Sequence, residues 1–293
     1  MESYHLNASS PNSCWKMPSV IDRIRLARAT GVDVTADMYP YTAAVKGLAD
    51  ILPTWTAANG KFFKTVAEPK TRVRTRAALE VNLTEYDGTS LETRVGPHDI
   101  RPIGFEKFEN KQYVGKRLDI TAFMRGQDWI DATLDWLISK GQRISTIYFS
   151  IDENNLRVQV QQTWIKFNTD AGGFDPAWAK AQGPYHPRAY GTWLRVLRKY
   201  DREERLITLE DSSRKTTSSV ADRLGLRQRG QIRVGFYADV ILFDPETIGE
   251  RATFEDSHQL SVGVREVRVN GARVLNDGEY TGATPGRYVK HKE

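Results

Sequence analysis

Short apolar runs alternate with amphipathic segments along roughly the first 220 residues, and this order restricts the fold more than any other feature of the chain. A strand at Val32–Ala36 is predicted to follow a helix near Pro18–Thr30, in which Val20, Ile24 and Ala27 share one face. The same order recurs further along the chain. A helix is predicted at Asp128–Lys140 and a strand at Ile144–Ser150, followed by a helix at Asp152–Gln161, which its first residue caps, and a strand at Trp164–Asn168. Repeated strand-then-helix order favours a parallel sheet with crossover helices.

The character of the chain changes after about residue 223. Short strands separated by Gly, Asn and Asp turns are predicted at Gln231–Arg233, Asp239–Phe243, Val264–Val269 and Ala272–Leu275. Asn270-Gly271 suits a type I′ hairpin turn, and Asn276-Asp277-Gly278 offers a second turn. The sequence therefore predicts two domains, 1–223 and 224–293, the second a small antiparallel β-domain.

Residues 51–115 break the pattern of the first domain. They combine mixed charge with several prolines and glycines, and only the stretch Lys70–Leu83 has a helical pattern. We interpret 51–115 as an insertion packed over one end of the sheet.

Composition excludes several classes of protein. The 293 residues carry a net charge of +5 with no block of like charge, and 10% are aromatic, so disorder and a nucleic-acid-binding module are not expected. No apolar run is long enough for a membrane span, and the N-terminus lacks the apolar region of a secretory signal. One cysteine, Cys14, suits a reducing compartment. A cytoplasmic protein without nucleic-acid or membrane partners is expected.

Asp170 is the first candidate functional residue. It follows the apolar strand Trp164–Asn168 and precedes Gly172 and Gly173, which is where α/β barrels place catalytic groups. A helix cap or a turn aspartate explains the position equally well.

Arg188 is the second candidate. It lies in the segment PYHPRAYGTW, residues 184–193, where two prolines stiffen a loop that can present a guanidinium to a carboxylate. Taken alone, a surface ion pair is a slightly better explanation. The histidines form no HxH or HExxH pair, so no metal motif is complete locally, and His5 by itself is uninformative.

Four segments together resemble the C-terminal portion of the amidohydrolase superfamily, in its D-aminoacylase (N-acyl-D-amino-acid deacylase) family. The first three are Tyr4–Leu6 with the downstream Asn12, Trp15 and Lys16, then TADMYPYTA at 35–43, then Thr169-Asp170 with HPRAYGT at 186–192. The fourth has two parts, a stretch from Leu224 to Pro245 and, further along the chain, Val269-Asn270-Gly271. Together they form a β-domain signature shared across amidohydrolases. The four occur in the family's order and cover nearly the whole chain outside 51–115.

The resemblance implies the C-terminal part of a TIM-like (α/β)₈ metal-dependent hydrolase barrel followed by a small antiparallel β-sandwich domain. It implies a zinc enzyme that cleaves the amide of an N-acyl-D-amino acid, in which metal-bound water attacks the carbonyl carbon. Asp170 matches the family's proton-transferring carboxylate, which also lies at the metal, and His5 matches a metal ligand. Arg188 matches the arginine that holds the substrate carboxylate, and Tyr39 and Tyr41 match the pocket wall.

Departures from the family pattern lead to a second set of expectations. Asn7 stands where the family has lysine, Cys14 does not match the family's ligand cysteine, and the upstream HxH pair has no counterpart. About four barrel strands are visible where a closed barrel needs eight. We therefore expect a truncated chain with an incomplete zinc ligand set, inactive alone, which either lacks an N-terminal half or self-associates.

Two alternatives stay open. The first is a catalytically inactive amidohydrolase-like fragment or partner subunit. The second is a cyclic-amide hydrolase of the hydantoinase or dihydroorotase type, against which Arg188 argues because that arginine presupposes a free substrate carboxylate.

Overall fold

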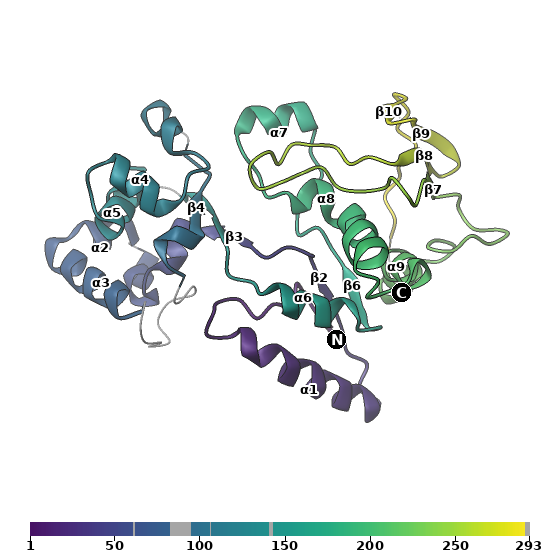
Figure 1. Cartoon of the computed structure of the whole chain (residues 1–293), viewed down its shortest axis with the longest axis horizontal. Coiled ribbons are helices and arrows are strands. Elements are labelled where there is room, and N and C mark those ends of the chain that lie inside the picture. The colour runs from purple at the N-terminus through teal and green to yellow at the C-terminus, as the bar shows by residue number, and fades with distance from the viewer. Residues whose placement is uncertain (61, 83–94, 106, 141–142, 291–293) are drawn as a thin grey trace.

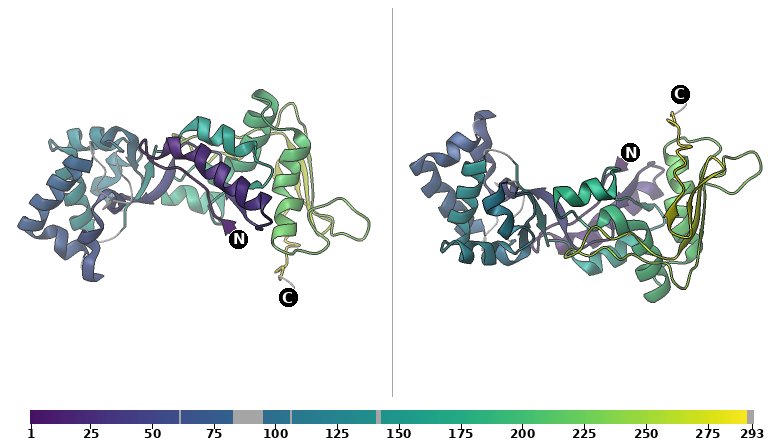
Figure 2. Two further views of the ribbon diagram at one scale, coloured as in Figure 1. Left: turned by 90° about the horizontal axis from the view of Figure 1, so that it is seen from below. Right: turned by 90° about the horizontal axis from the view of Figure 1, so that it is seen from above.

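The structure is a computed structural model that describes residues 1–293 apart from 61, 83–94, 106, 141–142 and 291–293. It is a mixed α/β fold with three sheets, spread along the long axis of the molecule in Figures 1 and 2. Short 3₁₀ helices connect the main elements at Cys14–Lys16, Leu48–Ile51, Thr54–Gly60, Pro97–Asp99 and Phe108–Tyr113. No helix in the described part of the chain is long and apolar enough to cross a membrane.

The central sheet is parallel, as the strand-then-helix order predicts. Its strand order is β1 (Glu2–Ser3), β2 (Thr35–Met38) and β6 (Ile165–Phe167), with Ala36 opposite Ile165. Its helices are α1 (Met17–Ala29), α6 (Glu153–Val160), α7 (Pro176–Gln182), α8 (Arg188–Arg195), α9 (Leu209–Thr216) and α10 (Ser218–Arg223). A π-helical stretch, Val196–Glu203, continues α8. The three described strands do not close a barrel.

Helix α6 begins at its predicted cap. The Asp152 carboxylate accepts the backbone N–H groups of Asn154 at 2.7 Å and Asn155 at 3.2 Å, which satisfies two donors at the start of the helix. Helix α6 packs against α1 in the hydrophobic core around Met38, Leu156 and Ile165.

The second sheet corrects one prediction. The run Ile144–Ser150 does form a strand, β5 (Ser145–Tyr148), but it pairs antiparallel with β3 (Ala44–Gly47) and β4 (Ile100–Pro102) and is not part of the parallel sheet. A short buried apolar run has the same pattern in both kinds of sheet, so the sequence does not distinguish them.

Helices cover this second sheet and share a core with it. They are α2 (Phe62–Ala67), α3 (Pro69–Asn82), α4 (Leu118–Met124) and α5 (Trp129–Lys140). The helices predicted near Lys70–Leu83 and Asp128–Lys140 are therefore confirmed. Trp136 and Tyr148 are among the largest buried side chains of this core.

The C-terminal sheet is antiparallel, in the order β10 (Glu279–Tyr280), β9 (Ala272–Asn276), β8 (Val264–Val269) and β7 (Val240–Phe243). The hairpin turn at Asn270-Gly271 is confirmed, with φ of 49° and 85°, and Asp277-Gly278 makes the second turn with 46° and 85°.

Two predictions for this region are wrong. Gln231–Arg233 does not form a strand; Ile232 there is 93% exposed and is not held by a neighbouring strand. The four described strands form one sheet instead of the two layers of a sandwich. Helix α10 ends at Arg223, where the sequence places the boundary between the two domains; that division stays a prediction.

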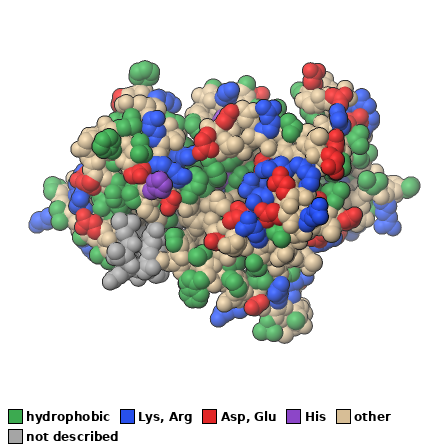
Figure 3. All heavy atoms as spheres, viewed as in Figure 1, with side chains coloured by type: hydrophobic (Ala, Val, Ile, Leu, Met, Phe, Trp, Pro, Cys, Tyr) green, Lys and Arg blue, Asp and Glu red, His purple; other side chains and the backbone are tan. Residues whose placement is uncertain are grey.

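On the face shown in Figure 3, basic and acidic side chains lie next to one another. Arg198, in the stretch that continues α8, pairs with Glu250, whose side chain is only 4% exposed.

Candidate functional site

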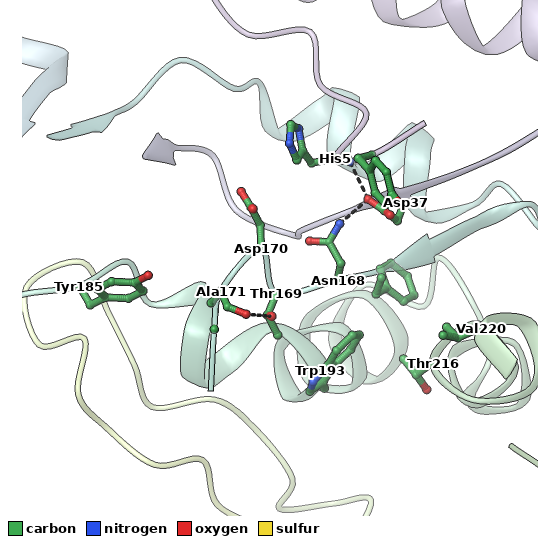
Figure 4. Close-up of a pocket in the computed structure, with 13 residues that line it drawn as sticks. His5, Asp37, Asn168, Thr169, Asp170, Ala171, Tyr185, Trp193, Thr216 and Val220 are labelled. Carbon is green, nitrogen blue, oxygen red and sulfur yellow. Dashed lines mark hydrogen bonds between the residues drawn. The ribbon is translucent and has the colours of Figure 1, made fainter. Parts of the chain in front are cut away.

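A cavity of about 830 Å³ lies at the carboxyl ends of the parallel strands. His5 follows β1, Asp37 lies in β2, and Asn168 and Asp170 follow β6 (Figure 4). Parallel strands end at one edge of a sheet, so residues far apart in the sequence meet there. The cavity therefore unites His5 and Asp170, the two metal-ligand candidates from the sequence.

Both candidates have an unusual backbone conformation. His5 has a φ of 33° and Asp170 a φ of 43°, and they are two of seven described non-glycine residues with positive φ. Such conformations cost free energy for L-residues and are concentrated at functional sites. Both residues line the cavity.

Asp37 holds His5 in this conformation. Its carboxylate accepts the His5 backbone N–H at 2.6 Å, and its main-chain carbonyl accepts the Leu6 N–H at 2.8 Å. The side-chain amide of Asn168 also donates to this carboxylate. Burial raises the pKa of Asp37, and the hydrogen bonds from His5 and Asn168 oppose that rise.

Asp37 lies inside the TADMYPYTA segment, residues 35–43, but it is not among the site residues that the sequence predicts. Its position at the end of a strand was the available signal, the same one that singled out Asp170. The contacts that give Asp37 a role come from His5 and Asn168, which are far from it in the sequence, so the sequence alone does not reveal them.

Arg188 pairs with Asp170. Its Nη2 lies 2.7 Å from Asp170 Oδ2, and the side chain of Arg188 is only 7% exposed against 40% for Asp170. The guanidinium carbon lies 4.4 Å from the centre of the Tyr39 ring. The Nε of Arg188 is buried and has no partner among the described residues, so the guanidinium keeps unused hydrogen-bonding capacity beside the cavity.

Tyr39 and Tyr41 occupy different surroundings. Asn7 Nδ2 donates to the Tyr39 hydroxyl at 3.1 Å, and burial raises the pKa of Tyr39 to about 12, with the Arg188 charge opposing the rise. The phenol therefore stays protonated and keeps its own hydrogen for an acceptor. Tyr41 lines a second cavity, of about 240 Å³, with Arg195 and Glu250.

The described residues do not complete a zinc site. A catalytic zinc has three protein ligands, whereas no group of three His, Cys, Asp or Glu side chains in the described ranges could hold a metal ion. His5 and Asp170 supply two donors at most, and Asp170 Oδ2 is already paired with Arg188. The chemistry below therefore rests on these side chains alone.

His186, next to this site, is expected to make the stability of the protein depend on pH. It is 1% exposed, and burial, followed by the Arg188 charge, lowers its pKa well below the ordinary value. Below about pH 6.5 the His186 imidazole binds a proton in the unfolded chain but not in the folded chain. The free energy of unfolding is therefore expected to fall by up to about 1.4 kcal/mol for each pH unit of acidification. Above that pH the effect is absent.

Urea unfolding followed by tryptophan fluorescence between about pH 7.5 and pH 5 measures this dependence. His186→Asn is the control, because asparagine does not titrate. The parent chain is expected to lose stability more steeply than the variant as pH falls; parallel curves for the two proteins would contradict the assignment.

Residues 170–275, which include Asp170, Arg188 and strands β7 and β8, match the model of the amidohydrolase family. The chain is a relative of the amidohydrolases, which confirms the resemblance inferred from its motifs.

Within that class, its relatives are D-amino-acid deacylases. It is 36% identical over 175 residues to a D-aminoacylase of Alcaligenes xylosoxydans xylosoxydans, a match that covers 60% of this chain and 34% of the relative. It is 39% identical over 144 residues to an N-acyl-D-aspartate deacylase of the same organism, covering 49% of this chain and 27% of the relative.

Two kinds of solved structure resemble the whole described fold. A D-aminoacylase with a binuclear metal centre matches with a TM-score of 0.69 and 25% identity over 96% of this chain. An N-acyl-D-glutamate deacylase of Bordetella bronchiseptica, solved with zinc and a phosphonate inhibitor, matches with a TM-score of 0.69 and 26% identity over 95% of this chain. The chain spans 48% of each of these structures.

Proposed function

We propose that this chain forms the carboxylate-binding and proton-transferring part of an enzyme that hydrolyses N-acyl-D-amino acids. The observation that carries the proposal is the pair Asp170–Arg188 at the strand ends, 2.7 Å apart beside the cavity. The relatives that carry deacylase names support the substrate class. We further propose that residues 1–223 supply the site and that 224–293 form a separate β-domain.

Arg188 and Tyr39 bind the free carboxylate of the substrate. The guanidinium is buried, with a donor left unpaired, and it offers the planar fork that suits a carboxylate. The Tyr39 hydroxyl accepts from Asn7 and donates its own hydrogen to the same anion. Tyr41 lines the second cavity, where Arg195 lies 5.0 Å from its ring centre.

Asp170 transfers the proton. In hydrolysis a water oxygen bonds to the amide carbon and the C–N bond breaks, while the water's proton moves to the leaving nitrogen. A carboxylate at the cavity edge can accept that proton and return it to the amine. His5 presents an imidazole to the same cavity. Zinc binding by these two residues requires donors beyond the described set.

A non-catalytic partner subunit is the second candidate, and the described residues favour it on one point, because they offer no three-ligand metal group. A cyclic-amide hydrolase of the hydantoinase type is disfavoured, since a hydantoin ring brings no free carboxylate to Arg188.

Calorimetric binding tests the proposal. N-acetyl-D-leucine is compared with N-acetyl-D-leucinamide, which lacks only the carboxylate charge. We expect the acid to bind at least about tenfold more tightly, because a charge-assisted pair contributes about 1.5–3 kcal/mol. Equal binding of the two ligands, or binding of neither, would exclude this site as a carboxylate site. The release of D-leucine from N-acetyl-D-leucine is then measured after addition of zinc. Release indicates an enzyme, and binding without release indicates a binding subunit.

A further inference from the structure

We infer that His186 is a positioning residue, a neutral hydrogen-bonding link that fixes the backbone of Arg188 and thereby aims its guanidinium at the cavity. This inference rests on the proposed role of Arg188 in carboxylate binding. It assigns a function to a buried titratable side chain that the proposed chemistry does not use.

Two hydrogen bonds determine the form of the imidazole. Its Nε2 lies 3.0 Å from the main-chain oxygen of Ala43, and its Nδ1 lies 3.0 Å from the backbone nitrogen of Arg188. A carbonyl oxygen can only accept and a backbone N–H can only donate. The ring must therefore carry its hydrogen on Nε2 and leave Nδ1 bare, which is the neutral Nε2–H tautomer.

These bonds join two segments that are far apart in the sequence. Ala43 follows the segment that carries Tyr39 and Tyr41, whereas Arg188 is the first residue of α8. The Arg188 N–H is one of the donors that a helix start leaves without an intrahelical partner. His186 thus caps the start of α8 and ties it to the tyrosine segment.

Three aromatic rings pack around the His186 imidazole and hold it in place. The ring centres of Phe254, Tyr41 and Tyr39 lie 5.1, 5.3 and 6.1 Å from that of His186, all in steep edge-to-face arrangements. Tyr39 is also the ring on which the Arg188 guanidinium stacks, at 4.4 Å. His186 therefore positions Arg188 through its backbone and through the ring beneath its side chain.

A histidine that only fills the core would have a different effect. Its replacement would lower stability and weaken all ligands alike, whereas loss of a positioning residue would weaken only ligands that bind Arg188. The affinity ratio of N-acetyl-D-leucine to N-acetyl-D-leucinamide separates these cases.

Two variants of His186 each remove one of its two hydrogen bonds. His186→Gln keeps a donor near Nε2 and loses the acceptor for Arg188, while His186→Asn keeps an acceptor near Nδ1 and loses the donor to Ala43. We expect His186→Gln to lower the acid-to-amide affinity ratio about tenfold and His186→Asn to lower it less. An unchanged ratio in both variants would overturn the inference. A parent chain that binds acid and amide equally would instead overturn the proposed function.

Nitrogen-15 spectra of the histidine rings in the parent chain provide a test that does not depend on folding of the variants. We expect one ring in the Nε2–H form that does not change between about pH 5.5 and pH 8. A titrating ring at position 186, or one in the Nδ1–H form, would contradict the assignment.

Discussion

Arg188→Met is expected to weaken the binding of N-acetyl-D-leucine to the chain about a hundredfold and to leave the binding of N-acetyl-D-leucinamide almost unchanged. Methionine keeps an unbranched apolar stem over Tyr39 and removes the guanidinium. Two charge-assisted hydrogen bonds to one carboxylate account for a loss of this size. The fold should survive, because Asp170 is 40% exposed and water can solvate its carboxylate when the partner is gone.

Arg188→Lys and Arg72→Met are the matched controls. Lysine keeps the charge but lacks the planar fork, so Arg188→Lys is expected to bind the acid with intermediate affinity. Arg72 also makes a 2.7 Å ion pair with an aspartate, Asp135, but it lies on α3 away from the cavity. Its replacement should leave the ratio of acid to amide affinity unchanged. Tight binding of the acid by Arg188→Met would exclude Arg188 as the carboxylate ligand.

The elements that the sequence predicts well are those with local signals. Helix α6 has a capping aspartate whose contacts lie within three residues, and α1 buries Met17 and Ile21, one turn apart. The sequence predicts a strand at Val32–Ala36, whereas β2 is Thr35–Met38. The prediction begins too early because valine has a high propensity for β-strands. In the structure Val32 is exposed, and the buried, paired residues are Ala36, Asp37 and Met38.

The site is predicted only in part because its contacts are long-range. The end of β6 identifies Asp170 from its neighbours alone, but the pairing with Arg188 depends on a positive φ at Asp170 and on where α8 begins. The link from His186 to Ala43 spans 143 residues. A family resemblance can name such residues; it cannot show which of them touch.

Gly263→Ala is expected to destabilise the chain by about 1–3 kcal/mol more than the same substitution at a glycine with the same φ. Gly263 has a φ of +83°, and a Cβ added there would lie 2.4 Å from Ile248 Cα and 2.5 Å from Ile248 N. Both atoms are backbone, so neither can move aside as a side chain would. Ile248 is itself buried, and the Gly263 carbonyl accepts the Asp244 N–H at 2.9 Å.

Gly282→Ala separates the destabilisation caused by the positive φ from that caused by the contact of the added Cβ. Gly282 also has a φ of +83°, but a Cβ there would meet nothing within 4 Å, so its variant should lose only the roughly 1–2 kcal/mol of a left-handed alanine. Urea unfolding of both variants, followed by far-ultraviolet circular dichroism, measures the difference. Because the φ angles match, any excess in Gly263→Ala reports the contact with the backbone of Thr247 and Ile248. Equal losses in the two variants would mean that the segments around Ile248 and Gly263 separate easily, and that the start of β8 is not fixed against the turn after β7.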